Sequence, residues 1–162
     1  MNKIGLYLIT LFGIGNLGKM PGTIASLVTC ILFLFMFVAE INIYILLIVF
    51  FILLVFSPNI IDKNIHQFKN LDPKEIVIDE FIGQSIPICL YEISHEGIKE
   101  TSTVLTFYFI MFVLFRIFDI TKPYPVSYYD KNFKNSFGVI MDDVVAGLYV
   151  VAVLVLYMVI TT

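Results

Sequence analysis

Long apolar runs alternate with short polar segments along most of the chain. Four runs stand out, at residues 24–39, 43–57, 103–118 and 144–160. Each is close to the length that carries an α-helix across the hydrocarbon core of a bilayer, about 20 residues. The pattern therefore predicts four membrane-spanning helices.

A fifth helix is predicted between the second and third runs. Asp72, Pro73 and Glu75 form a helix-start signal, because the Asp side chain caps free amides, Pro suits the first turn and Glu reaches back. A helix from Pro73 to Glu92 has about 20 residues and spans roughly 30 Å. We expect a kink at Pro87. This helix is long enough to cross the membrane.

A crossing by this fifth helix places most of the basic residues on one side of the membrane. Without that crossing, residues 115–123 and 141–147 would lie on the opposite side of the membrane from the loop at residues 58–75. With it, nine of the ten basic residues share a side and only Lys99 lies opposite. Because basic loops stay in the cytoplasm, we expect the nine to be cytoplasmic. They are Lys3, Lys19, Lys63, Lys69, Lys74, Arg116, Lys122, Lys131 and Lys134.

The composition agrees with a membrane protein, since 59% of the 162 residues are hydrophobic and 14% are charged. We expect an all-α, multi-pass helical bundle of about five transmembrane or re-entrant helices, formed by residues 1–162 as a single membrane-embedded domain. Residues 1–12 are expected to be an interfacial or re-entrant segment. Cys30 and Cys89 lie in apolar runs and are expected to be packing residues. The net charge of −3 argues against nucleic acid as a partner, and no protein partner is predicted.

Acidic residues gather near helix ends on the predicted cytoplasmic face. Carboxylates at the edge of a low-dielectric core repel one another and need a cation or basic partners. Oxygen ligands without His or Cys suit a hard ion, with Mg²⁺ first and Mn²⁺ or Ca²⁺ behind. The candidates for catalysis and for metal binding are Asp79, Glu80, Asp119, Asp142 and Asp143.

Basic and glycine-rich segments on the same face complete a set of groups suited to a phosphate ester. Arg116 and Asp119 are three residues apart and can share a helix face, and Lys122 follows the predicted helix. Thr23, after Gly22, is predicted to cap the helix that enters the membrane, where free amides attract anions. Gly22, Thr23, Arg116 and Lys122 are therefore the candidate phosphate-binding residues.

Each of these features also has a purely structural interpretation. Asp119 can pair with a neighbouring basic residue, and Asp142 and Asp143 can merely charge the start of the last helix. The glycine-rich loop can be ordinary turn chemistry. Gly83 and Gly147 are expected to allow close helix packing. The convergence of the charged residues on one face nevertheless favours a functional site.

Four segments resemble the motif blocks of the phosphatidylglycerophosphatase A family, in the family's order: "PGTIASL", "IVIDEFIGQSI", "FRIFDITKPYPVSYYDKN" and "GVIMDDVVAG". The resemblance implies a Mg²⁺-dependent bacterial membrane phosphatase that converts phosphatidylglycerophosphate to phosphatidylglycerol in phospholipid biosynthesis. It also implies a place in the bacterial cytoplasmic (inner) membrane, and the charge pattern directs the active site to the cytoplasm. Gly18 and Ala25 depart from the family pattern, which often has proline and glycine there. The motif positions are Asp79, Glu80, Asp119, Lys122, Asp142 and Asp143, with Pro21, Gly22 and Thr23 in the first block.

The expected mechanism is metal-assisted hydrolysis, because no Cys or His lies within the clustered motifs to form a covalent intermediate. Mg²⁺ held by some of the five acids would polarise the phosphate, and a remaining carboxylate would act as the general base. Direct attack by an aspartate remains open. The alternatives are a phosphatase for another lipid phosphate, an ion-coupled transporter with acids near the membrane midplane, and a non-catalytic scaffold without a cation cluster.

Overall fold

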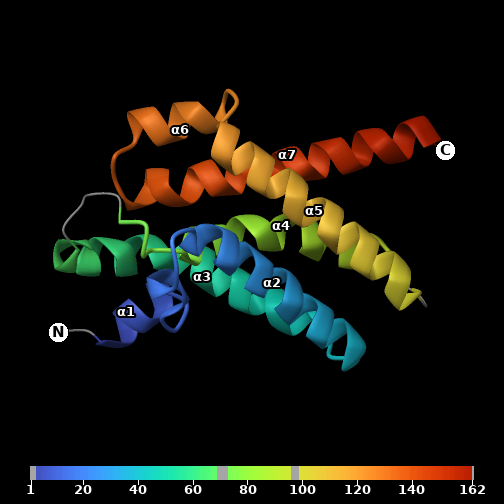
Figure 1. Cartoon of the computed structure of the whole chain (residues 1–162), viewed down its shortest axis with the longest axis horizontal. Coiled ribbons are helices and arrows are strands. Elements are labelled where there is room, and N and C mark those ends of the chain that lie inside the picture. Colours follow the sequence, from blue (N-terminus) through green and yellow to red (C-terminus); the bar gives the residue numbers. More distant parts are fainter. Residues whose placement is uncertain (1–2, 69–72, 96–98, 162) are drawn as a thin grey trace.

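The computed structural model describes residues 3–68, 73–95 and 99–161, and most of these residues are helical. No β-strand occurs within these three ranges, so the all-α prediction is confirmed. Two short 3₁₀ helices, Ile14–Asn16 and Ile65–Gln67, accompany the α-helices. The α-helices are α1 (Lys3–Ile9), α2 (Pro21–Val38), α3 (Ile43–Asn64), α4 (Ile78–Ser94), α5 (Thr101–Thr121), α6 (Val126–Asn132) and α7 (Ser136–Thr161) (Figure 1).

Four helices, α2, α3, α5 and α7, are long and apolar enough to cross a membrane. Each corresponds to one of the four predicted apolar runs, so these predictions are confirmed, although α2 ends at Val38, one residue before the end of its run. The helices extend beyond the runs into polar sequence. α7, for example, begins at Ser136, before the apolar run at residues 144–160. The run begins later than the helix because Asp142 and Asp143 interrupt the apolar pattern but are themselves helical.

Large apolar side chains on these four helices point away from the protein. Phe35, Phe51, Phe109 and Val159 are each more than half exposed. Monomeric soluble proteins rarely expose apolar surface on this scale, whereas lipid accommodates it readily. The protein is therefore a multi-pass membrane protein.

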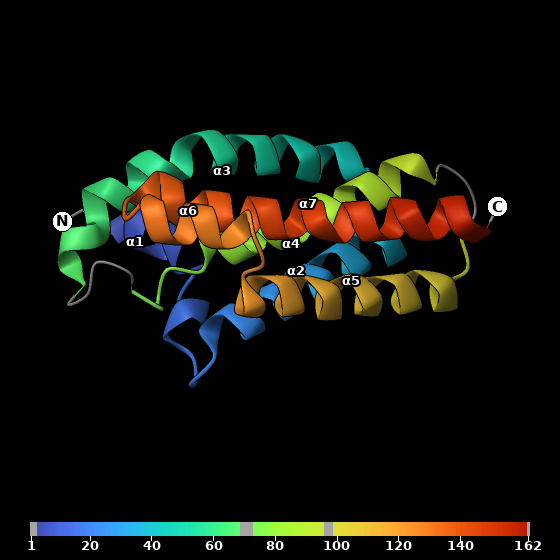
Figure 2. The ribbon, with the colours of Figure 1, turned by 90° about the horizontal axis from the view of Figure 1, so that it is seen from above.

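α4 lies in the interior of the bundle, between α3 on one side and α2 with α5 on the other (Figure 2). Twelve of its 17 residues are buried. Burial inside the protein explains why α4 can carry polar residues such as Gln84 and Ser85 and is less apolar than the four lipid-facing helices. α4 begins toward the end of the bundle where α3 finishes, and it finishes toward the end where α5 begins (Figure 1).

The predicted start of this helix at Pro73 is wrong, because α4 begins at Ile78. The amide of Ile76 donates to the carbonyl oxygen of Pro73 at 3.0 Å in a turn, and the amide of Val77 donates to the carbonyl oxygen of Ile9 at 2.9 Å. These bonds hold the segment before α4 in a non-helical conformation against the end of α1. Asp72, the predicted cap, lies outside the described residues.

α4 and α7 cross in close contact at two glycines. A Cβ atom added to Gly83 would lie 2.6 Å from the carbonyl oxygen of Asp143 and 2.7 Å from the Phe115 ring. A Cβ on Gly147 would meet the carbonyl oxygen of Gly83. The prediction that both glycines serve helix packing is confirmed. Their small size brings the first turn of α4 next to Asp143.

The two cysteines, Cys30 and Cys89, are buried free thiols within the core, as predicted. They pack among apolar residues contributed by α2, α4, α5 and α7.

Candidate metal and phosphate site

A cavity of about 220 Å³ lies where α4 begins, α5 ends and α7 begins. α6 lies beside the first turns of α7 and closes one wall (Figure 1). The structure brings six of the nine predicted site residues to this cavity: Asp79, Glu80, Asp119, Lys122, Asp142 and Asp143.

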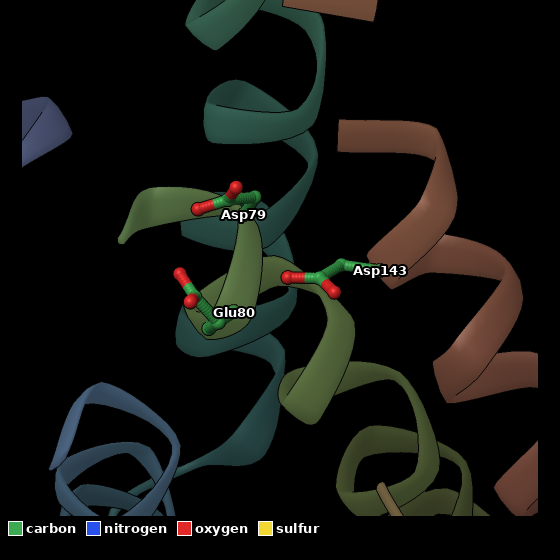
Figure 3. A group of neighbouring side chains, drawn as sticks. All are labelled: Asp79, Glu80 and Asp143. Carbon is green, nitrogen blue, oxygen red and sulfur yellow. The ribbon is translucent and has the colours of Figure 1, made fainter. Parts of the chain in front are cut away.

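Three of the acids form a cluster, Asp79, Glu80 and Asp143, which we call the three-carboxylate cluster. Each offers one carboxylate oxygen within 4.8 Å of the other two. Figure 3 shows Asp79 and Glu80 side by side in the first turn of α4, with the carboxylate of Asp143 pointing toward them from α7. Asp79 is 9% exposed and Asp143 is 3% exposed. Two of the three carboxylates therefore lie where water has little access.

Two buried oxygens of this cluster lack a hydrogen-bond partner. Oδ1 of Asp79 and Oε2 of Glu80 accept no hydrogen bond from the described part of the chain. A buried carboxylate without a donor or counter-charge is strongly unfavourable, and adjacent like charges add to that cost. Oxygen-only donors with this geometry fit a hard divalent cation. The residues present thus fit the ion that the sequence predicts.

The other two predicted acids are paired with basic side chains. Oδ2 of Asp142 lies 2.8 Å from Nζ of Lys122, and Oδ2 of Asp119 lies 2.7 Å from Nη1 of Arg116. Nη1 of Arg116 also donates to Oγ of Ser26 at 3.3 Å. The expected group of five acids is therefore divided in two. Three carboxylates are left to share a cation, and two hold basic groups in place.

Lys122 is held at the cavity by two carboxylates. It follows α5 directly, as predicted, in a left-handed conformation with φ of 44°. Its ammonium donates to Oδ1 of Asp130 at 2.6 Å and to Oδ2 of Asp142 at 2.8 Å. Partial burial lowers the pKa of Lys122, but these two hydrogen bonds and the negative charges of Asp142 and Asp130 together outweigh it and raise that pKa above its ordinary value. Lys122 therefore carries its positive charge at neutral pH.

Asp130 is a cavity residue that the sequence analysis did not single out. Its side chain comes from α6, and the hydrogen bond from Lys122 lowers its pKa below the ordinary value. Asp130 lies inside the third motif block, which is the signal that could have pointed to it. Only the return of the chain after α5 brings it to Lys122.

The remaining predicted residues, Gly22, Thr23 and Arg116, are not among the residues that line the cavity. Gly22 lies directly behind Glu80, and a Cβ atom there would meet Oε1 of Glu80 and lie 3.4 Å from Nη1 of Arg116. Gly22 therefore allows α2 to approach α4 and α5 closely.

The prediction that Thr23 caps α2 is wrong. α2 begins at Pro21 and is preceded by Met20, so Thr23 lies inside the first turn. Its hydroxyl oxygen is buried and has no hydrogen-bond partner among the described residues. Proline is favoured at the first helical position, where its missing amide costs nothing, and this preference starts the helix two residues before Thr23.

Comparisons with known proteins show the family to which the chain is related. The family model for Phosphatidylglycerophosphatase A matches residues 7–158. A phosphatidylglycerophosphatase A of Haemophilus influenzae is 32% identical over 143 residues, which cover 88% of this chain and 81% of that protein. No solved structure matches the chain.

Two further relatives match about half of the chain. A phosphatidylglycerophosphatase A of Escherichia coli is 34% identical over 77 residues, 48% of this chain and 40% of that protein. A putative phosphatidylinositol-3-phosphatase of Bacteroides thetaiotaomicron is 40% identical over 78 residues, 48% of this chain and 44% of that protein.

Proposed function

The chain belongs to the phosphatidylglycerophosphatase A family, a family of lipid phosphate hydrolases, and from this premise we propose its reaction. The protein hydrolyses the terminal phosphate of phosphatidylglycerophosphate with Mg²⁺ bound, and releases phosphatidylglycerol and inorganic phosphate. The observation that carries the proposal is the three-carboxylate cluster, buried at one end of a membrane-spanning bundle and short of hydrogen-bond donors.

Asp79, Glu80 and Asp143 would hold the metal ion. Their oxygens converge from two helices whose crossing at Gly83 and Gly147 leaves little freedom of position. When bound, Mg²⁺ supplies positive charge that neutralises phosphate oxygens and polarises the phosphorus. The preformed geometry means that little conformational entropy is lost when the ion binds.

Lys122 supplies the second positive charge for the phosphate. Its ammonium is anchored by Asp130 and Asp142, so it stays at the cavity wall before a substrate arrives. A fixed donor in a site shielded from water stabilises developing negative charge better than a mobile one. Arg116 serves a different purpose in this proposal, because its ion pair with Asp119 orients that carboxylate toward the cavity.

The reaction consumes one water molecule. The oxygen of the water attacks the phosphorus, and the bond between phosphorus and the glycerol oxygen breaks. A carboxylate that lines the cavity accepts a proton from the attacking water, and the departing glycerol oxygen takes up a proton to become a hydroxyl. The acyl chains remain in the bilayer, because the cavity lies at the helix ends where a lipid headgroup can enter.

Phosphate release by purified protein from several lipid phosphates tests this function. We expect release from phosphatidylglycerophosphate, loss of activity after chelation and recovery with Mg²⁺. The panel includes phosphatidylinositol 3-phosphate, because of the resemblance to the putative phosphatidylinositol-3-phosphatase. Faster release from that lipid, or release that is indifferent to chelation, would overturn the proposal.

A further inference from the structure

We propose that Lys74 and Lys134 form a second anion site at the mouth of the cavity, which binds the phosphodiester of the substrate while the terminal phosphate lies near Lys122. The inference rests on the activity proposed above. It adds the feature by which the site would distinguish a lipid with two phosphates from a lipid with one.

The two lysines come from different connections and line the same cavity. Lys74 lies in the turn before α4, and Lys134 lies between α6 and α7. Both are exposed, whereas Asp79 and Asp143, which line the same cavity, are buried. An anion that enters from the membrane surface therefore meets the two lysines before it meets the acids.

The lining charges distinguish these two lysines from the other basic groups nearby. Lys122 is engaged by Asp130 and Asp142. Lys74 and Lys134 form no hydrogen bond or ion pair with residues 3–68, 73–95 and 99–161. Their ammonium groups are thus available to a ligand.

The negative charge of the cavity makes positive charge at its entrance necessary for binding an anion. Six carboxylates line it, and a negatively lined cleft repels an anionic ligand unless positive charge is placed at its entrance. A bound divalent cation compensates the three-carboxylate cluster, but this compensation acts only at the inner end. Lys74 and Lys134 supply the attraction at the outer end.

The size of the cavity directs the second phosphate to the entrance. Its volume of about 220 Å³ is below the roughly 300–1,000 Å³ of pockets that enclose drug-sized ligands, so it admits a headgroup and leaves the lipid tails outside. In phosphatidylglycerophosphate a glycerol unit separates the terminal monoester from the diester. With the monoester at the acids, the diester remains at the mouth. Phosphatidate has only a monoester and leaves the two lysines without a ligand.

The test compares these two lipids in neutral detergent micelles, where no anionic surface is present. We expect the double variant Lys74→Ala/Lys134→Ala to lose about tenfold in kcat/KM on phosphatidylglycerophosphate, mainly through KM. For phosphatidate, measured as a substrate or as a competitive inhibitor, we expect KM or the inhibition constant to change by less than about twofold. Retained interaction with phosphatidate also shows that the variant is folded.

Lys131→Ala is the matched control. The hydrogen bond from Lys122 is the largest cause of the lowered pKa of Asp130, and the positive charges of Lys134 and Lys131 also lower it. Unlike Lys134, Lys131 does not line the cavity. We expect wild-type kinetics from this control. Equal losses on both lipids, no loss on phosphatidylglycerophosphate, or a Lys131→Ala loss equal to that of the double variant would each overturn the second anion site. A wild-type protein that leaves phosphatidylglycerophosphate intact would overturn the proposed function itself.

Discussion

Individual carboxylates in this protein have different surroundings, and the surroundings separate their expected roles. Asp79 and Asp143 are buried beside Glu80 with only other acids close by, whereas Asp119 and Asp142 each hold a basic side chain. An unpaired buried acid depends on a metal ion for its counter-charge, and a paired acid does not. Substitutions can therefore distinguish the two groups.

Asp79→Asn and Asp143→Asn should each remove one metal ligand, and we expect turnover to fall about 100-fold or more. A second measurement is independent of activity. Mg²⁺ should raise the unfolding temperature of the wild type, because it binds the folded state, and should shift that of the variants much less. Asp62→Asn, at an exposed position of α3, is the control and should behave as wild type in both assays. Equal Mg²⁺ shifts in all four proteins would contradict a metal site at these residues.

The contribution of the Lys122–Asp130 ion pair to stability should change with pH only in acid. The pKa of Asp130 is lowered in the folded protein, so the pair contributes to stability above the ordinary Asp pKa of about 3.9 and loses that contribution as pH falls through the lowered value. Asp130→Asn removes this dependence. We expect the variant's unfolding temperature to decline less than that of the wild type as pH falls below about 4, and by a small amount because the pair is partly exposed. A steeper decline in the variant would contradict the assignment.

At the scale of elements, the crossing of α4 and α7 determines the shape of the site. Gly83 and Gly147 allow the two helix backbones to touch, and the same contact places the first turn of α4 beside Asp143. Packing and site geometry therefore depend on the same two residues. A methyl group at the crossing must push the helices apart, since backbone atoms on the other helix cannot move away as a flexible side chain can.

Gly83→Ala should consequently reduce both stability and activity. We expect a loss of about 1–3 kcal/mol in the free energy of unfolding, with reduced turnover from displacement of Asp143. Leu148→Ala is the control, because Leu148 adjoins Gly147 on α7 but is half exposed on the outer face. Thermal unfolding in detergent and phosphate release measure the two effects. A Gly83→Ala protein with wild-type stability and turnover would show that the crossing tolerates a larger residue.

At the scale of the whole molecule, the charge of the connecting segments predicts the orientation in the membrane. The bundle end that carries the cavity also carries the end of α3 and the start of α7, while the start of α5 lies at the other end (Figure 1). Because Lys99 is the one basic residue among those the structure describes that lies near the start of α5, the positive-inside rule predicts that the cavity faces the cytoplasm.

Single cysteines at exposed positions test this orientation. We expect Lys63→Cys and Lys131→Cys to react with a membrane-impermeant thiol reagent only from the cytoplasmic side, and Glu100→Cys only from the opposite side. The wild-type chain is the control, since Cys30 and Cys89 are buried. Reaction of all three variants from one side would refute a crossing by α4.

The amino-acid sequence by itself determined the four apolar helices, the all-α class and the residues that carry the family motifs. These are local properties, because hydrophobicity over about 20 residues is enough to specify a membrane span. The errors were also local. Helix starts at Pro73 and Thr23 were predicted from side-chain preferences, but the backbone bond from Val77 to Ile9 and the proline at position 21 decided the actual starts.

Tertiary structure alone decided which of the acids meet. Asp79, Glu80 and Asp143 converge from α4 and α7, and Asp142 of α7 binds Lys122 after α5. The spacing along the chain indicated the pair of Arg116 and Asp119, three residues apart, but not these other contacts. Ion pairing depends on distances of a few ångströms between helices far apart in the sequence, and the glycine crossing of α4 and α7 sets those distances. Asp130, Lys74 and Lys134 joined the cavity for the same reason, since the path of the connections brings them there.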